Sequence, residues 1–107
     1  MDPIQISGEE ALASALGAPR FLLVKHSPIC PISARGFAEY RAFLAEHPDT
    51  PSAWIDVIGQ RALSLAVAER TGIKHESPQA LVLCDGVVTW HASHGAITRA
   101  ALAEALG

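Results

Sequence analysis

The segment HSPICPIS, residues 26–33, places one thiol, Cys30, between two prolines and a hydroxyl, Ser33, three residues later. The thiolate form of cysteine attacks disulfides, so the chemistry offered here is thiol–disulfide exchange. Because a hydroxyl forms no disulfide, Ser33 cannot displace a thiol that has become bound to Cys30. The segment therefore predicts exchange through one cysteine, with the second thiol supplied from outside the motif.

Cys30 stands at the junction of two predicted elements. The apolar run at 21–24 is typical of a strand buried on both faces, and residues 31–45 have the apolar spacing of a helix with Pro31 at its first position. The free N–H groups and the positive dipole end of that helix would face the sulfur and favour the thiolate. We also expect the Ser33 hydroxyl to donate to the sulfur. The alternative, a small buried core cysteine, fits a proline-flanked junction less well.

The remaining elements must hold this junction in place. We expect an edge strand at 4–6, helices at 9–16 and 61–71, strands at 53–57 and 80–83, a hairpin turn at 85–86, a strand at 87–92 and a final helix within 97–106. Ser7 is the expected N-cap of the first helix, and Ser93 or Thr98 that of the last. The pattern predicts an α/β fold with one mixed sheet of four to five strands, parallel crossovers first and then an antiparallel hairpin, flanked by helices on both faces.

The composition narrows the function classes. The chain has 107 residues, of which 50% are hydrophobic and 18% charged, and its formal net charge is −3. This length fits a single domain, 1–107. Acidic and basic residues are interleaved, which argues against binding to nucleic acid or to an anionic membrane surface. The sequence shows no signal-peptide pattern and no apolar run of ~18 residues, so we expect a cytoplasmic protein.

Three separated motifs resemble those of a known family. They are K-H-S-x-x-C-P-I-S at 25–33, K-H-E-S-P-Q-A-L at 74–81 and W-H-A-S-H at 90–94. Together they are similar to the monothiol bacilliredoxins, bacillithiol-system (YtxJ-type) proteins of the thioredoxin-like superfamily. The resemblance implies a thioredoxin-like fold in which Pro78 is cis and faces Cys30, Ser77 exposes a backbone edge to substrate, and Gly95 borders the substrate groove. The chain departs from the family pattern at Ile29, usually Thr, and at Gly95, usually an aromatic residue.

The resemblance also implies a function. Bacilliredoxins are thiol–disulfide oxidoreductases that remove bacillithiol, a low-molecular-weight thiol, from mixed disulfides on oxidised proteins. No bound cofactor is implied, and bacillithiol is the co-substrate. The implied partners are bacillithiolated proteins, the small thiol and a disulfide reductase that recycles it, with the protein acting as a monomer or weak dimer. We expect no metal site, because no close Cys-x-x-Cys or His-x-x-x-His pair occurs.

Cations near the motifs are candidate ligands of the small thiol. Because bacillithiol carries carboxylates on its malate portion, Lys25, Arg35 and Lys74 are candidate contacts. The alternative for each is a solvated surface charge.

Three histidines near the motifs are candidates for acid–base roles. His26 precedes Cys30 by four residues, His75 precedes the predicted cis proline by three, and His94 precedes Gly95. An imidazole near the sulfur could stabilise the thiolate or protonate the leaving thiol. A surface position or a loop hydrogen bond is the alternative for each.

The second cysteine, Cys84, ends the strand that begins after Pro78, roughly 20 Å away at the rise of a strand. That is too far for a disulfide with Cys30 without rearrangement, and an inert thiol is the simplest interpretation. Other functions stay open: a thioredoxin-like reductase with Cys84 or a partner's thiol as resolver, or a non-catalytic module that senses redox state through Cys30. A weaker alternative is a dimer that binds an iron–sulfur cluster through Cys30 and an external thiol.

Overall fold

A four-stranded mixed sheet, with strands in the order β2-β1-β3-β4, forms the centre of the molecule. The computed structural model describes residues 2–106. The strands are β1 (Arg20–His26), β2 (Ser52–Asp56), β3 (Gln79–Cys84) and β4 (Val87–Ser93). Strand β1 is parallel to β2 and antiparallel to β3, and β4 is antiparallel to β3. The predicted mixed sheet is thus confirmed, with a single parallel crossover where we expected more than one.

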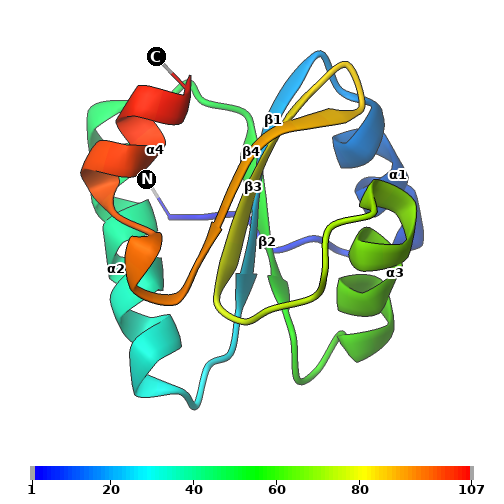
Figure 1. Cartoon of the computed structure of the whole chain (residues 1–107), viewed down its shortest axis with the longest axis horizontal. Coiled ribbons are helices and arrows are strands. Elements are labelled where there is room, and N and C mark those ends of the chain that lie inside the picture. Colours follow the sequence, from blue (N-terminus) through cyan, green and yellow to red (C-terminus); the bar gives the residue numbers. More distant parts are fainter. Residues whose placement is uncertain (1, 107) are drawn as a thin grey trace.

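Helices cover both faces of the sheet (Figure 1), as predicted for this α/β class. Helices α1 (Glu9–Gly17) and α3 (Arg61–Thr71) lie on one face, and α2 (Pro31–Glu46) and α4 (Arg99–Leu106) lie on the other, preceded by the short 3-10 helix η1 (His94–Ala96). Within residues 2–106, none of the helices is long and apolar enough to cross a membrane.

Each face of the sheet has its own hydrophobic core. Leu22 and Val24 of β1 pack in the cluster under α2 and α4, whereas Leu23 between them packs in the cluster under α1 and α3. All three are buried, which is why the sequence shows an unbroken apolar run there. The next residue on the α3 side of β1 is Lys25, which is also fully buried. A cation therefore occupies a core position at the end of β1.

The ends of the helices differ in part from the predictions. Gly72 ends α3 with a φ of 76°, as its position predicted. Thr98 caps α4, because its Oγ1 accepts a hydrogen bond from the N–H of Ala101 at 3.0 Å. Ser7 does not cap α1: the N-cap position is Gly8, and no side chain caps that helix.

The expected edge strand at residues 4–6 is only an isolated bridge. Gln5 and Trp54 form it in parallel register, with the N–H of Ile6 donating to Trp54 O at 2.8 Å and the N–H of Trp54 donating to Ile4 O at 2.9 Å. Pro3 and Gly8 lie close on either side, so the extended segment is too short to continue the ladder.

Candidate active site

Cys30 is the N-cap residue of α2. Its backbone is extended, with φ −103° and ψ 123°, and Pro31 follows in the first turn. The backbone N–H of Cys30 donates to Ser27 O at 3.2 Å, and its carbonyl accepts from the N–H of Ala34 at 2.9 Å. The half-buried thiol therefore lies at the helix terminus whose free N–H groups and dipole favour negative charge.

Ser33 lies one turn into α2 and is fully buried. Its Oγ accepts the N–H of Ser27 at 2.8 Å and lies 2.8 Å from Nδ1 of His26. A hydroxyl has one proton, and we assign it to the bond with the neutral imidazole. The hydrogen bonds of this hydroxyl go to Ser27 and His26 and not to the Cys30 sulfur, so the expectation that Ser33 donates to that sulfur is wrong. Ser33 instead fixes the loop that precedes Cys30.

His26 is part of the same support and does not line the space beside the thiol. Its ring stacks on Phe37 at a centroid distance of 4.2 Å and meets Trp54 edge-on at 5.5 Å. Burial lowers the pKa of His26, and a hydrogen bond with the backbone of Ser33 and the charge of Asp56 oppose this effect only in part. The structure thus places His26 as a neutral, packed side chain that holds Ser33.

A groove of about 450 Å³ runs beside Cys30 on the side of α3. We call it the α3-side groove; it is lined by Ser27, Cys30, Val57, Ile58, Arg61, His75 and Ser77. These residues come from the loops after β1 and β2, the start of α3 and the segment before β3. The loops that follow β1 and β2 meet at one edge of the sheet because the two strands are parallel (Figure 1). Two predicted site residues, His75 and Ser77, thus share a groove with the thiol.

A smaller groove of about 220 Å³ lies on the side of α4. This α4-side groove is lined by Pro31, Ile32, Arg35, His94, Gly95 and Ile97. Arg35, His94 and Gly95 were predicted near the site, and the structure brings them together here. Nδ1 of His94 lies 3.8 Å from Oε2 of Glu76.

Pro78 is next to residues of both grooves: it follows Ser77 of the α3-side groove and is hydrogen-bonded to His94 of the α4-side groove. The Ser77–Pro78 peptide bond is cis. Pro78 is buried against α2, where Gly36 leaves room for it: a Cβ at position 36 would lie 3.6 Å from Pro78 Cβ. The carbonyl of Pro78 accepts the N–H of His94 at 3.1 Å, which ties the start of β3 to the end of β4. Through these contacts Pro78 connects α2, the segment before β3 and the α4-side groove.

The three cations predicted to bind the small thiol differ in burial: Lys25 is buried, Lys74 is exposed, and Arg35 lines the α4-side groove. Lys25 is fully buried, with its Nζ 3.0 Å from Nδ1 of His75, and burial lowers the pKa of Lys25 from 10.5 to about 8. We expected Lys25 to contact a carboxylate of the small thiol, and the structure corrects this expectation. Lys25 is not exposed, because β1 directs its side chain into the core under α3. Lys74 is exposed and lines neither groove.

Arg61, the first residue of α3, is the cation of the α3-side groove, and sequence reasoning missed it. It lies 31 positions after Cys30 in the chain, so no local motif connects the two. The available signal was topological: Arg61 follows β2 as Cys30 follows β1, and the carboxyl ends of parallel strands share one edge of the sheet.

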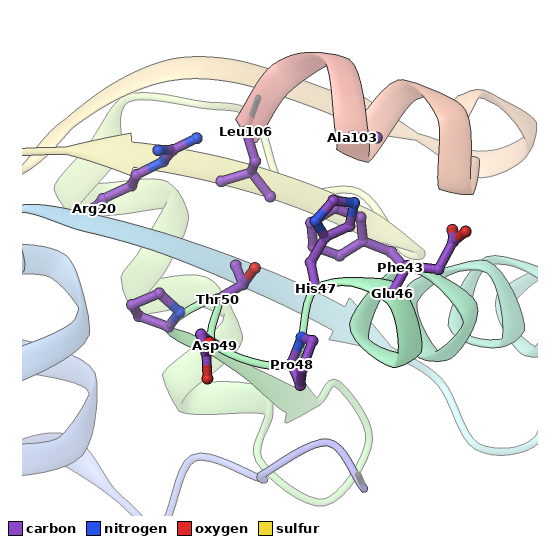
Figure 2. A pocket seen from close by; sticks show the side chains of 10 residues that line it. Arg20, Phe43, Glu46, His47, Pro48, Asp49, Thr50, Ala103 and Leu106 are labelled. Atoms are coloured by element: carbon purple, nitrogen blue, oxygen red, sulfur yellow. The ribbon is translucent and has the colours of Figure 1, made fainter.

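Cys84 lies at the opposite end of the sheet from Cys30. It pairs in register with Arg20 at the start of β1, whereas Cys30 follows the end of that strand. Both cysteines are free. A cavity of about 390 Å³ lies at this far end, between the 47–51 loop, Arg20 and the end of α4 (Figure 2). It contains no thiol and is separate from the site around Cys30.

Comparisons with solved structures define the class of the protein. A candidate oxidoreductase with a thioredoxin fold is 33% identical and matches with a TM-score of 0.90, over 98% of this chain and 94% of that one. A variant thioredoxin from Halobacterium salinarum NRC-1 matches with a TM-score of 0.74 at 22% identity, over 96% and 86% of the two chains. Oxidised thioredoxin from Plasmodium falciparum matches with a TM-score of 0.73 at 13% identity, over 96% of this chain and 93% of that one. The protein has the thioredoxin fold, and with a thiol at the start of α2 it falls in the class of thiol–disulfide oxidoreductases.

The family can be named more narrowly. The model of the family described as monothiol bacilliredoxin BrxC matches residues 5–102, a range that includes Cys30, Ser33 and Pro78. The chain belongs to this family, and the resemblance inferred from the three motifs is confirmed.

Proposed function

We propose that this protein removes bacillithiol from mixed disulfides on oxidised proteins, with Cys30 as its nucleophile. The observation that carries the proposal is the pairing of a thiol on the N-cap residue of α2 with a buried Ser33 whose hydroxyl is bonded to Ser27 and His26. The site offers one sulfur and a fixed hydroxyl, so a thiol bound to Cys30 must be released by a thiol from solution.

The proposed reaction has two exchange steps. The Cys30 thiolate bonds to the sulfur of bacillithiol, the mixed disulfide breaks, and the electron pair leaves on the sulfur of the repaired protein, which is then protonated. A second bacillithiol molecule, as thiolate, bonds to the bacillithiol sulfur held on Cys30. It releases the Cys30 thiolate and a bacillithiol disulfide, which a separate reductase returns to the thiol. The cycle requires a reducing compartment, as the cytoplasm provides.

The charges around Cys30 support a small anionic thiol as the co-substrate. Arg61 in the α3-side groove and Arg35 in the α4-side groove are the guanidinium groups that line these spaces. Guanidinium groups bind carboxylates in bidentate geometry, and bacillithiol carries carboxylates on its malate portion. We propose Arg61 as the principal contact because Arg61 and Cys30 line the same groove.

The protein half of the mixed disulfide needs a different surface. Ile29, Ile32 and Ile58 are 83%, 56% and 52% exposed. Ile29 precedes Cys30 in the chain, Ile32 follows it by two residues and lines the α4-side groove, and Ile58 lines the α3-side groove with Cys30. Exposed apolar side chains gathered around a reactive group mark a contact surface for a protein. We propose that the substrate chain packs on these isoleucines and pairs with the backbone at Ser77, before Pro78.

The test is turnover of one protein carrying either bacillithiol or glutathione on the same cysteine. Cys30→Ser should abolish release of bacillithiol, and Cys84→Ser should leave it unchanged. Equal loss in both variants would favour an internal resolver, and modification of Cys30 without recycling would favour a sensor. Arg61→Met should raise KM for the bacillithiolated substrate more than for the glutathionylated one. Arg70→Met, on the exposed side of the same helix, is the matched control.

A further inference from the structure

A buried lysine lies beneath the site without an acidic partner. Lys25 is fully buried, and among residues 2–106 its side chain forms no ion pair with a carboxylate. Gln79, its neighbour on β3, has a buried Oε1 that lacks a hydrogen-bond partner in the same part of the chain. A buried ammonium group without a carboxylate destabilises a fold, and proteins retain such groups mainly where function needs them.

The contact that Lys25 does make is with His75. Its Nζ lies 3.0 Å from Nδ1 of His75, and Oγ of Ser64 lies 3.4 Å from the same atom. An ammonium group only donates, so Nδ1 must accept and the proton of the neutral imidazole must be on Nε2. His75 lines the α3-side groove together with Cys30, and because Nδ1 is turned toward the buried groups, we infer that the opposite ring edge, with Nε2, faces this groove.

The charges around His75 keep it neutral. Burial, Lys25 of β1 and Arg61 of α3 all lower the pKa of His75, and Glu76 in the adjacent segment opposes them only in part. The pKa of Lys25, lowered to about 8 by burial, comes close to the ~8.5 of an ordinary thiol. A proton can therefore pass from the lysine to a thiolate with little change in free energy.

We propose that Lys25 and His75 form a proton relay that protonates the thiolate leaving when Cys30 attacks a mixed disulfide. The proposal rests on thiol–disulfide exchange at Cys30 and not on the identity of the small thiol. His75 is the donor at the reacting sulfur, and Lys25 is the positioning residue that acts through it.

The relay balances as a single step. The Cys30 thiolate bonds to the nearer sulfur, the disulfide breaks, and the electron pair leaves on the second sulfur. That sulfur takes the proton from Nε2 of His75, while Nδ1 takes a proton from Nζ of Lys25. The products are a thiol, a neutral imidazole protonated on Nδ1, and a neutral amine. The relay resets when solvent protonates Nε2 of His75 and Nδ1 returns its proton to the buried amine.

The experiment compares two disulfides that differ in their leaving thiols. 5,5′-Dithiobis(2-nitrobenzoate) releases an acidic aromatic thiol, which leaves as a stable thiolate, whereas bis(2-hydroxyethyl) disulfide releases a basic alkyl thiolate that benefits from protonation. Reduced protein is mixed with each disulfide, and the single-turnover rate at Cys30 is measured. Lys25→Met and His75→Gln should slow the alkyl reaction at least about tenfold and change the aromatic one less than about twofold. His91→Gln, an exposed histidine of β4 outside both grooves, should change neither rate.

Equal slowing of both reactions in the two variants would overturn the relay, because it would show a general effect on Cys30. The wild-type protein gives a reading that does not depend on how the variants fold. The ratio of its alkyl rate to its aromatic rate should fall as the pH rises through about 8, where Lys25 loses its proton. A ratio that does not change with pH would also overturn the relay. Failure of both disulfides to react with wild-type Cys30 would instead contradict the exchange chemistry itself.

Discussion

The Oγ atom of Ser33 lies 2.8 Å from Nδ1 of His26 and 2.8 Å from the backbone nitrogen of Ser27. The position of a second thiol in a two-cysteine motif is thus occupied by a buried hydroxyl with partners of its own. These bonds join the end of β1 to the first turn of α2, across the loop that carries Cys30. Ser33 therefore has two effects in the single-thiol motif: it removes the second thiol, and its hydrogen bonds hold the loop that carries Cys30.

Ser33→Ala should lower the free energy of unfolding by about 1–3 kcal/mol, because the N–H of Ser27 and the imidazole of His26 lose their buried partner. Urea unfolding at pH 7 measures this loss. Ser14→Ala is the control, since Ser14 is exposed on α1 and alanine there should be neutral or slightly stabilising. Equal stability of the two variants would contradict the importance of the Ser33 bonds.

Lys25→Met should stabilise the fold, by about 1–3 kcal/mol at pH 7, because it removes a buried ammonium group and keeps the volume of the side chain. The pKa of Lys25 is lowered from 10.5 to about 8, so the unfolded chain holds this proton more tightly than the folded one. The stability of the wild type should therefore rise between about pH 8 and pH 10.5, and the advantage of the variant should shrink over that window. Urea unfolding at pH 7 and pH 10 measures both effects, and a destabilised variant at pH 7 would contradict the prediction.

The stability of the protein should fall as the pH drops below about 6.5, the ordinary value for histidine. Burial lowers the pKa of both His26 and His75, so the folded state favours their neutral forms and the unfolded chain binds more protons. His26→Gln should flatten this decline between pH 7 and pH 5 in urea unfolding. His91→Gln should not, because His91 is exposed on β4. An identical decline in the His26 variant and the wild type would show that His26 titrates normally in the fold.

Position 36 should accept alanine and reject larger side chains. A Cβ there would lie 3.6 Å from Pro78 and 3.8 Å from Ile97, which is ordinary contact. Gly36→Ala should therefore raise the unfolding free energy by up to about 1 kcal/mol through helix propensity and leave the exchange rate unchanged. Gly36→Leu should displace Pro78, cost about 1–3 kcal/mol and slow exchange at Cys30. Thermal unfolding and single-turnover rates measure both, and normal exchange in the leucine variant would show that Pro78 need not keep its place.

Local signals in the chain were sufficient for most of the fold. The unbroken apolar runs predicted β1 and β3 because central strands are buried on both faces, and Gly72 marked the end of α3 because it alone there adopts a positive φ at low cost. The prediction of an edge strand at residues 4–6 was wrong, because local propensity does not determine how many residues of a strand pair with the next strand. Antiparallel pairing of β3 with β1 likewise depends on how the intervening helices pack, and not on the strand itself.

The sequence by itself determined the candidate nucleophile, its place at a helix start, the lack of a second thiol beside it in the motif and the family. These features depend on residue types and on distances of a few residues along the chain, both of which can be read directly from the sequence. Only the tertiary structure decided which distant groups meet at Cys30. It buried Lys25 against His75, turned Ser33 toward His26 and brought Arg61 into the groove. The physical reason is that side-chain direction at a strand end, and the meeting of loops at one edge of a sheet, follow from strand order and helix packing across the whole chain.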